Sequence, residues 1–163
     1  MTEAWLTGPV EGVNPVLMPA AHSFLQVRDE MPHLLAGLTL EQIWQEAGAS
    51  ASIGYHAIHL AGATDRLLTY ARDEQLSVDQ IEAMKGEKGL VGLDAVAIVA
   101  RVQSAMNAAI DQVRRTPAET VLAPRAVGRQ RLPSTVIGLI FHAAEHATRH
   151  AGQVSTLRKI VRS

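Results

Sequence analysis

The sequence predicts an all-α fold, a four-helix bundle with a long crossover connection, in a single domain over residues 1–163. Two observations support this fold class. In four long segments, apolar residues recur at spacings of three, four and seven, which is the period of an amphipathic helix. No segment shows the convincing alternation of apolar and polar residues that marks a strand. Hydrophobic residues make up 47% of the chain, which suits one sizeable buried core.

The first predicted helix begins at Pro15, after a loop or arm formed by residues 1–14. Asn14 suits the cap of this helix, and proline fits the first helical turn because its missing N–H is not needed there. Gly37 suits the end of the helix. Pro32 lies inside the pattern and should kink or shorten the helix.

The remaining elements alternate between helices and polar connections. We expect a short helix from Thr39 that ends by Gly48, followed by a long helix over residues 51–74. A connection over 75–91, with one helical turn near Ser77, then leads to a long helix over 92–115. A loop over 116–133 comes next, and the last helix, capped by Ser134, runs to about residue 161. Because it holds several prolines and glycines, we interpret the 116–133 segment as a loop that crosses the molecule.

Composition excludes several kinds of function. The formal charge is -1 and the pI about 6.7, so the chain has no excess of positive charge to bind a nucleic-acid backbone. It contains no cysteine, which excludes disulfides, thiolate metal ligands and a cysteine nucleophile. The sequence lacks a signal peptide and a long uncharged apolar run, so we expect a cytoplasmic protein without a membrane partner.

Histidine clustering is the main indication of function. His142, His146 and His150 recur every four residues in the last helix, and His59 lies in the second long helix. Residues four apart lie about 40° apart on one face of a helix, so two imidazoles can converge on one metal ion. A helical wheel places these histidines with Leu139, and therefore on a stripe that should face the bundle interior.

Other histidines have ordinary interpretations. His22 and His33 are expected to be satisfied or half-exposed residues without a metal role. His56 precedes His59 by one turn, and we favour a supporting or solvent role for it. The sequence His-Ala-Thr-Arg-His lacks the glutamate of the zincin motif, which argues against a metalloprotease.

Three segments resemble the DinB-like (DinB/YfiT) superfamily of four-helix-bundle proteins. They are Ser52–Tyr70 with its His59-Leu-Ala motif, Pro124–Arg129, and Ile137–Gln153 with its His-x-x-x-His-x-Gly-Gln ending. The resemblance extends over most of the chain from about Asn14. It implies a metal triad at His59, His146 and His150 that holds a divalent ion such as nickel, zinc or iron. The usual ending of the family is His-Arg-Gly-Gln, whereas here it is His150-Ala-Gly-Gln, which leaves the ligands intact and removes one charge.

The resemblance also implies a homodimer and an activity. Alanines of the third long helix would let helices approach closely in such a dimer: Ala95, Ala97, Ala100, Ala105, Ala108 and Ala109. Some members of the family look like S-transferases that use a low-molecular-weight thiol, bacillithiol or mycothiol, with a small-molecule substrate. In such an enzyme His56 or His142 would move the proton. The alternative is a non-catalytic, metal-stabilised protein with a binding or stress-response role, and a site closed by a fourth protein ligand would favour it.

Overall fold

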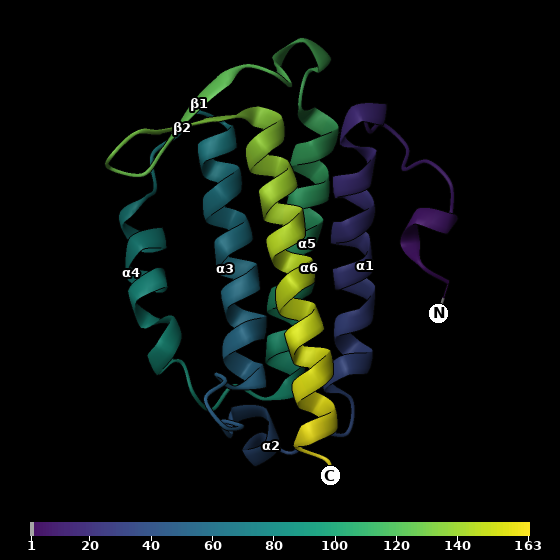
Figure 1. The fold of residues 1–163 in the computed structure, drawn as a ribbon, viewed down its shortest axis with the longest axis vertical. Helices are drawn as coiled ribbons and strands as arrows, with labels where there is room; N and C mark the ends of the chain where they lie inside the picture. The colour runs from purple at the N-terminus through teal and green to yellow at the C-terminus, as the bar shows by residue number, and fades with distance from the viewer. Residues whose placement is uncertain (1) are drawn as a thin grey trace.

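Four long helices lie side by side in the computed structural model, which describes residues 2–163 (Figure 1). They are α1 (Met18–Leu35), α3 (Ile53–Ala71), α5 (Ala95–Arg115) and α6 (Val136–Ile160). Helices α1 and α3 each pack on both α5 and α6, so α1 and α3 occupy opposite corners of the bundle. The predicted all-α bundle is confirmed.

Side-chain caps set where the helices begin. The Ser52 hydroxyl accepts a hydrogen bond from the Tyr55 N–H (3.2 Å) and starts α3. Helix α6 begins one residue later than predicted, because Thr135 rather than Ser134 is its cap. Ser134 lies within a strand and pairs with Arg125, so the extended backbone continues past it before the helix can start.

The N-terminal region agrees with the prediction apart from two short turns. Asn14 caps a 3-10 helix, η2 (Pro15–Leu17), which leads into α1, and a further 3-10 helix, η1 (Ala4–Leu6), lies in the expected arm. Helix α1 continues through Pro32 and ends at Leu35, shortly before Gly37, whose φ of +72° lies in the left-handed region that terminates helices. The short helix α2 (Leu40–Trp44) then follows a capping box at Thr39.

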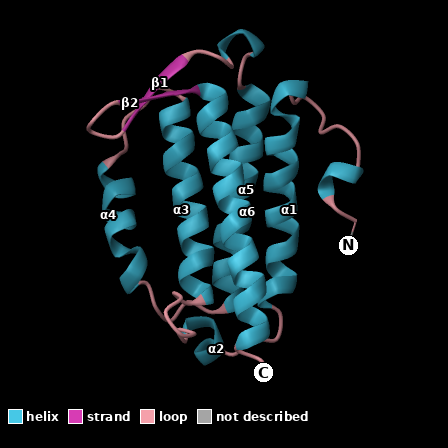
Figure 2. Ribbon diagram, in the orientation of Figure 1, coloured by secondary structure: helices cyan, strands magenta, loops and turns pink. Residues whose placement is uncertain are grey.

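Both long connections hold more structure than predicted. Residues 75–91 contain a nine-residue helix, α4 (Val78–Gly86), and a 3-10 helix, η3 (Glu87–Gly89), instead of one turn. The expected loop over 116–133 contains the 3-10 helix η4 (Ala118–Thr120) and an antiparallel hairpin of β1 (Pro124–Val127) and β2 (Leu132–Thr135), drawn in magenta in Figure 2. The prediction of no strand was therefore wrong. Each strand has only four residues, too few for alternation to be visible in the sequence.

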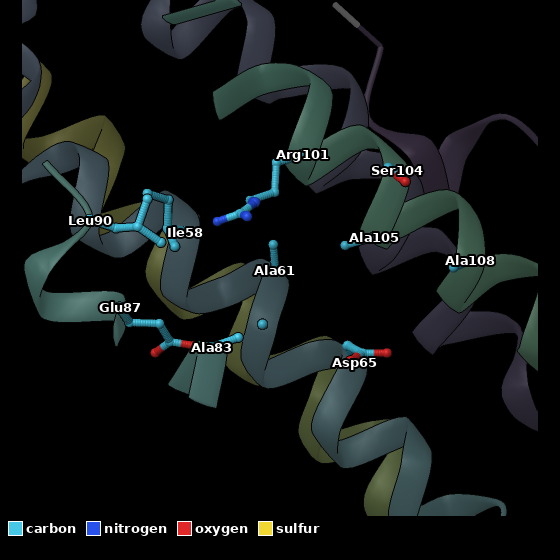
Figure 3. A pocket seen from close by; sticks show the side chains of 11 residues that line it. Ile58, Ala61, Asp65, Ala83, Glu87, Leu90, Arg101, Ser104, Ala105 and Ala108 are labelled. Carbon is cyan, nitrogen blue, oxygen red and sulfur yellow. The ribbon is translucent and has the colours of Figure 1, made fainter. Parts of the chain in front are cut away.

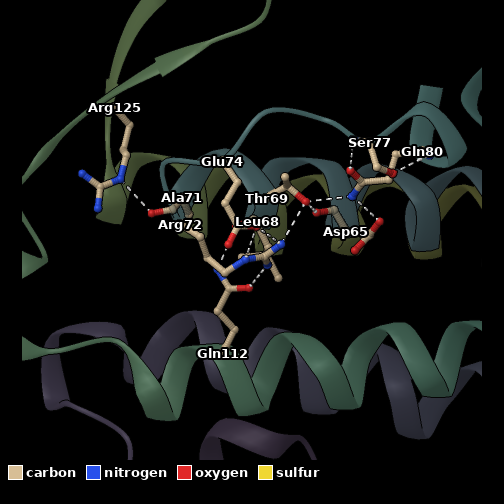
Figure 4. A network of polar contacts seen from close by, with 10 residues as sticks. All are labelled: Asp65, Leu68, Thr69, Ala71, Arg72, Glu74, Ser77, Gln80, Gln112 and Arg125. Carbon is tan, nitrogen blue, oxygen red and sulfur yellow. Dashed lines mark hydrogen bonds and ion pairs between the residues drawn. The ribbon is translucent and has the colours of Figure 1, made fainter.

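A polar network fixes the C-terminal end of α3 against its neighbours (Figure 4). From α4, the Gln80 amide donates to Asp65 Oδ2 (2.6 Å). From α5, the Gln112 amide donates to the Leu68 carbonyl (2.8 Å), and from β1 the Arg125 Nε donates to the Ala71 carbonyl (2.8 Å). Three separate elements thus hold α3 in place.

Helix α3 differs from the other long helices in burying polar as well as apolar side chains. Helices α1 and α5 bury only apolar side chains, among them Phe24, Met31, Ile98 and Met106. Among residues 2–163, the buried polar or charged side chains are Ser52, His56, Thr64, Arg66, Thr69 and Glu87, and all but the last belong to α3 or its cap. No helix in this part of the chain is long and apolar enough to cross a membrane.

Candidate metal centre

Three histidines meet where α3 packs on α6. His59 comes from α3, and His146 and His150 come from consecutive turns of α6. One ring nitrogen from each lies within 4.8 Å of the other two, close enough for all three to bind one ion. The ring centroids are 5.1 Å apart for His59 and His146, 4.8 Å for His59 and His150, and 4.5 Å for His146 and His150.

These three histidines lie at the edge of the core, which corrects the expected interior position. Each of the three is half-buried, and the His59 side chain is 22% exposed. The reason is rotational: the buried residues of α6, such as Ile140, Ala147 and Ala151, centre on a direction about 90° from His146 on the helical wheel. The three rings are therefore partly exposed to solvent.

Neighbouring side chains orient two of the three rings. His59 Nδ1 lies 2.7 Å from Glu87 Oε2, and the ring stacks on Tyr55 with 5.5 Å between centroids and 8° between planes. His150 Nδ1 lies 2.8 Å from Nδ1 of the buried His56. In both rings Nδ1 has a partner. Where Nδ1–H of the ring is the donor, to Glu87 from His59 and to His56 from His150, the lone pair on Nε2 is left for an ion.

Two buried ring nitrogens have no hydrogen-bond partner within residues 2–163: His146 Nδ1 and His56 Nε2. An unsatisfied buried polar atom costs about 1–3 kcal/mol. Natural structures hold few such atoms, and both of these occur in or beside the histidine group. Their position fits a site that receives a further ligand.

The environment lowers the pKa of three of these rings, His146, His150 and His56. Burial, together with the charges of His59, His142 and Arg149, lowers the pKa of His146 to about 4. Burial and the neighbouring histidines lower the pKa of His150 to about 3. Burial and His59 also lower the pKa of His56. At neutral pH these rings carry free lone pairs, which is the form that binds a metal.

His142 does not join the group. Its side chain is 52% exposed, and its Nδ1 lies 3.5 Å from Glu145 Oε2, in a cluster that also contains the ion pair between Glu145 and Arg149. The interior stripe predicted for His142 was therefore wrong, since it lies further from the buried face of α6 than His146 does. Within residues 2–163 the candidate group holds three ligands and no fourth.

Sequence reasoning missed Glu87. The Glu87 carboxylate accepts from His59 and, through Oε1, from Arg66 Nη1 at 2.6 Å. Burial alone would raise the pKa of Glu87, but the hydrogen bonds and charges of His59 and Arg66 outweigh it and hold that pKa below its ordinary value. Glu87 lies in a polar, glycine-containing segment that predicts a connection, so no local pattern singled it out.

Comparison with known proteins identifies the family. The sequence pattern of the DinB superfamily matches residues 23–154, which is most of the chain. The chain belongs to the DinB superfamily. A crystal structure of a DinB-like protein from Bacillus cereus is similar in fold, with a TM-score of 0.63 over 84% of this chain and 89% of that chain, at 17% sequence identity. No curated protein matches the chain.

A pocket of about 510 Å³ in this DinB-superfamily protein includes Glu87 in its lining but none of the three histidines (Figure 3). Its walls come from α3, from the α4–η3 segment and from α5, and include Ala61, Asp65, Glu87 and Arg101. Its volume is in the range of small-molecule sites. Glu87 is shared by this pocket and the histidine group, because its carboxylate also contacts His59.

Proposed function

We propose that this protein binds one divalent metal ion through His59, His146 and His150, and that it is a metal-dependent enzyme. The carrying observation is the group of three ring nitrogens within 4.8 Å of one another, with no fourth protein ligand among residues 2–163. Three protein ligands with a position left for water or substrate are typical of catalytic sites, whereas four are typical of structural ones. Imidazole suits nickel, zinc and iron, which are the candidate ions.

The proposed reaction is the transfer of a low-molecular-weight thiol to an electrophile. The chain has no cysteine, so the sulfur must come from a small thiol such as bacillithiol or mycothiol. A bound divalent ion would lower the pKa of that thiol and favour the thiolate. With a haloaromatic, a carbon–sulfur bond forms, the carbon–halogen bond breaks, and halide and the thiol proton leave. With an epoxide, a carbon–sulfur bond forms, the ring carbon–oxygen bond breaks, and the resulting alkoxide oxygen takes up a proton.

Two further histidines have distinct roles in this proposal. His56, buried behind His150 with Nδ1 at 2.8 Å from Nδ1 of that ring, holds His150 in place. His142 stands on the exposed turn before His146, with 5.8 Å between ring centroids. It is therefore the better placed of the two to pass the thiol proton to solvent.

A thiol-conjugation assay tests the activity. Metal-loaded protein should accelerate attack of bacillithiol or mycothiol on a haloaromatic or an epoxide, because a free thiol with a pKa of about 8.5 is only a few per cent ionised at neutral pH. The rate should require metal and should be lost in His59→Ala, while His33→Ala should keep it. Absence of metal-dependent acceleration, in protein shown to hold one ion per chain, would contradict the transferase proposal.

The second candidate is a non-catalytic protein in which the metal stabilises the bundle. It is supported by the origin of the ligands, because an ion between His59 of α3 and the two histidines of α6 would cross-link two helices. This candidate predicts metal-dependent stability without conjugation activity, so the same assay separates the two.

We also propose a homodimer formed by bundle helices. Three alanines of α5, namely Ala97, Ala100 and Ala108, are exposed and would permit close approach of a second copy, whereas Ala109 belongs to the core. Light scattering at micromolar concentration should give twice the 17.5 kDa of one chain. A mass of 17.5 kDa would contradict the dimer.

A further inference from the structure

Glu87 is the one buried residue in the stretch between Ala71 and Ile98. Helix α4 buries no residue at all, so the one buried side chain of this stretch is a carboxylate that is only 6% exposed. Burial of a charge is costly, and replacement of a buried ion pair by apolar side chains is often neutral or stabilising. A segment that served packing alone would more simply bury an apolar side chain at this point.

Both oxygens of the buried carboxylate are used. Oε2 lies 2.7 Å from His59 Nδ1, and Oε1 accepts from Arg66 Nη1 at 2.6 Å. The Arg66 side chain is itself only 10% exposed, so this ion pair is largely shielded from solvent. The result is a chain of contacts from the buried Arg66 through Glu87 to the half-buried His59.

Gly62 makes room for this chain. It lies on α3 between His59 and Arg66, and a Cβ atom there would lie 2.5 Å from Glu87 Oε1 and 2.9 Å from Arg66 Nη1. Both distances are too short for real contacts, so any larger residue would have to displace the pair. Glycine in a helix interior is unfavourable relative to alanine by about 1 kcal/mol. At this position the side chains of Glu87 and Arg66 occupy the space that a Cβ atom would need, which explains why the residue is glycine.

We propose that Glu87 is a positioning residue of the metal centre, which, held by Arg66, orients His59 so that Nε2 faces the ion. This inference rests on the metal site of the proposed function. A carboxylate only accepts hydrogen bonds, so the proton between the two groups belongs to His59 Nδ1. That tautomer leaves the lone pair on Nε2. Outer carboxylates of this kind fix both the tautomer and the ring plane of a histidine ligand.

Two contacts restrict the orientation of the His59 ring. Tyr55 stacks on its face, and Glu87 holds its Nδ1 edge. The attachment of α4 itself does not depend on Glu87 alone, because the Gln80 amide donates to Asp65 Oδ2 (2.6 Å) and Thr69 Oγ1 (2.8 Å). Loss of the carboxylate should therefore disturb His59 before it detaches the segment.

The first test replaces the carboxylate with an amide. Glu87→Gln keeps the size but offers a single acceptor oxygen to two donors, so the contact with His59 or with Arg66 is lost. The dissociation constant for Zn²⁺, measured by competition with a chelating indicator on metal-stripped full-length protein, should rise about 10- to 100-fold. Glu82→Gln is the matched control, because Glu82 is exposed and pairs with Lys85 on the same helix; its affinity should equal wild type.

The second test displaces the pair without removing a charge. Gly62→Ala should weaken Zn²⁺ binding in the same direction although it favours the helix. Gly152→Ala is its matched control: Gly152 lies in α6, a Cβ there meets nothing within 4 Å, and it points about 200° away from His150 on the helix. This control should bind Zn²⁺ as wild type does.

A spectroscopic measurement separates positioning from general stability. The ¹⁵N shifts of His59 in metal-free wild-type protein should report the Nδ1–H tautomer, and Glu87→Gln and Gly62→Ala should reduce that preference. Wild-type affinity and an unchanged His59 tautomer in both variants would overturn the role of Glu87 while leaving the metal site intact. A wild-type protein that binds no Zn²⁺ would instead overturn the site and the inference together.

Discussion

The α1–α5 side of the bundle and the α3 side bury different kinds of side chain. Helices α1 and α5 bury apolar residues throughout, including Phe24, Met31 and Met106. Helix α3 buries His56, Thr64, Arg66 and Thr69, and carries His59 at its edge. Apolar burial stabilises a fold in proportion to area, whereas buried polar groups add little net stability and specify geometry. We infer that the first side maintains the fold and the second side carries the function.

Truncation of the apolar side should have the largest effect on stability. Phe24 is fully buried, so Phe24→Ala should lower the free energy of unfolding by about 3–5 kcal/mol, measured by urea titration. Val16→Ala is the control, because Val16 is 58% exposed. The folded Phe24→Ala protein should still take up metal. A loss below about 1 kcal/mol would show that the α1–α5 side does not dominate stability.

Metal should stabilise the fold through the α3 side. An ion that binds only the native state adds about 2.7 kcal/mol at a free concentration 100 times its dissociation constant. The melting temperature of metal-stripped protein should therefore rise on addition of Zn²⁺ or Ni²⁺, and that of His150→Ala should not. Equal rises in both proteins would locate the bound ion elsewhere.

Acid should weaken the metal-free protein before its carboxylates titrate. In the folded state the pKa of His146 is about 4 and that of His150 about 3, against an ordinary value of 6.5. The unfolded chain thus binds more protons, and stability is complete above about pH 6.5 and falls as the pH drops towards 4. The urea midpoint should be lower at pH 5 than at pH 7, with a smaller difference in His146→Ala. A midpoint that rises between pH 7 and pH 5 would contradict the pKa values.

The effect of bound metal on amide hydrogen exchange should be the smallest of the effects predicted here. Metal should slow amide exchange in α3 and α6 around the three histidines and leave the α1–α5 side unchanged, because the ligands come only from the first two helices. Slowing of equal size in all four long helices would mean that the two sides respond as one unit.

The parts of this arrangement that are local in the chain were predictable. His146 and His150 are one turn apart in a single helix, so their spacing alone indicated a shared face. The four long helices followed from apolar periods, and their ends from caps such as Asn14 and glycines such as Gly37.

The parts of the arrangement that depend on tertiary contacts could not be predicted from the sequence. A helical wheel shows that His142 and His146 share a face but not which way the core lies, and the structure leaves His142 exposed. Glu87 meets His59 across 28 residues of sequence, in a segment whose composition indicates a connection. The hairpin depends on pairing between Pro124–Val127 and Leu132–Thr135, which neither strand reveals alone.

Elemental analysis tests the central claim most directly. Protein purified without an affinity tag should contain one divalent ion per chain, and His146→Ala and His150→Ala should each contain none. The matched controls are His22→Ala and His33→Ala, since His22 contacts the Gly8 carbonyl instead (2.9 Å) and neither histidine joins the group; both should keep the full metal content. Equal metal content in all four variants would show that the site formed by His59, His146 and His150 is not the metal centre.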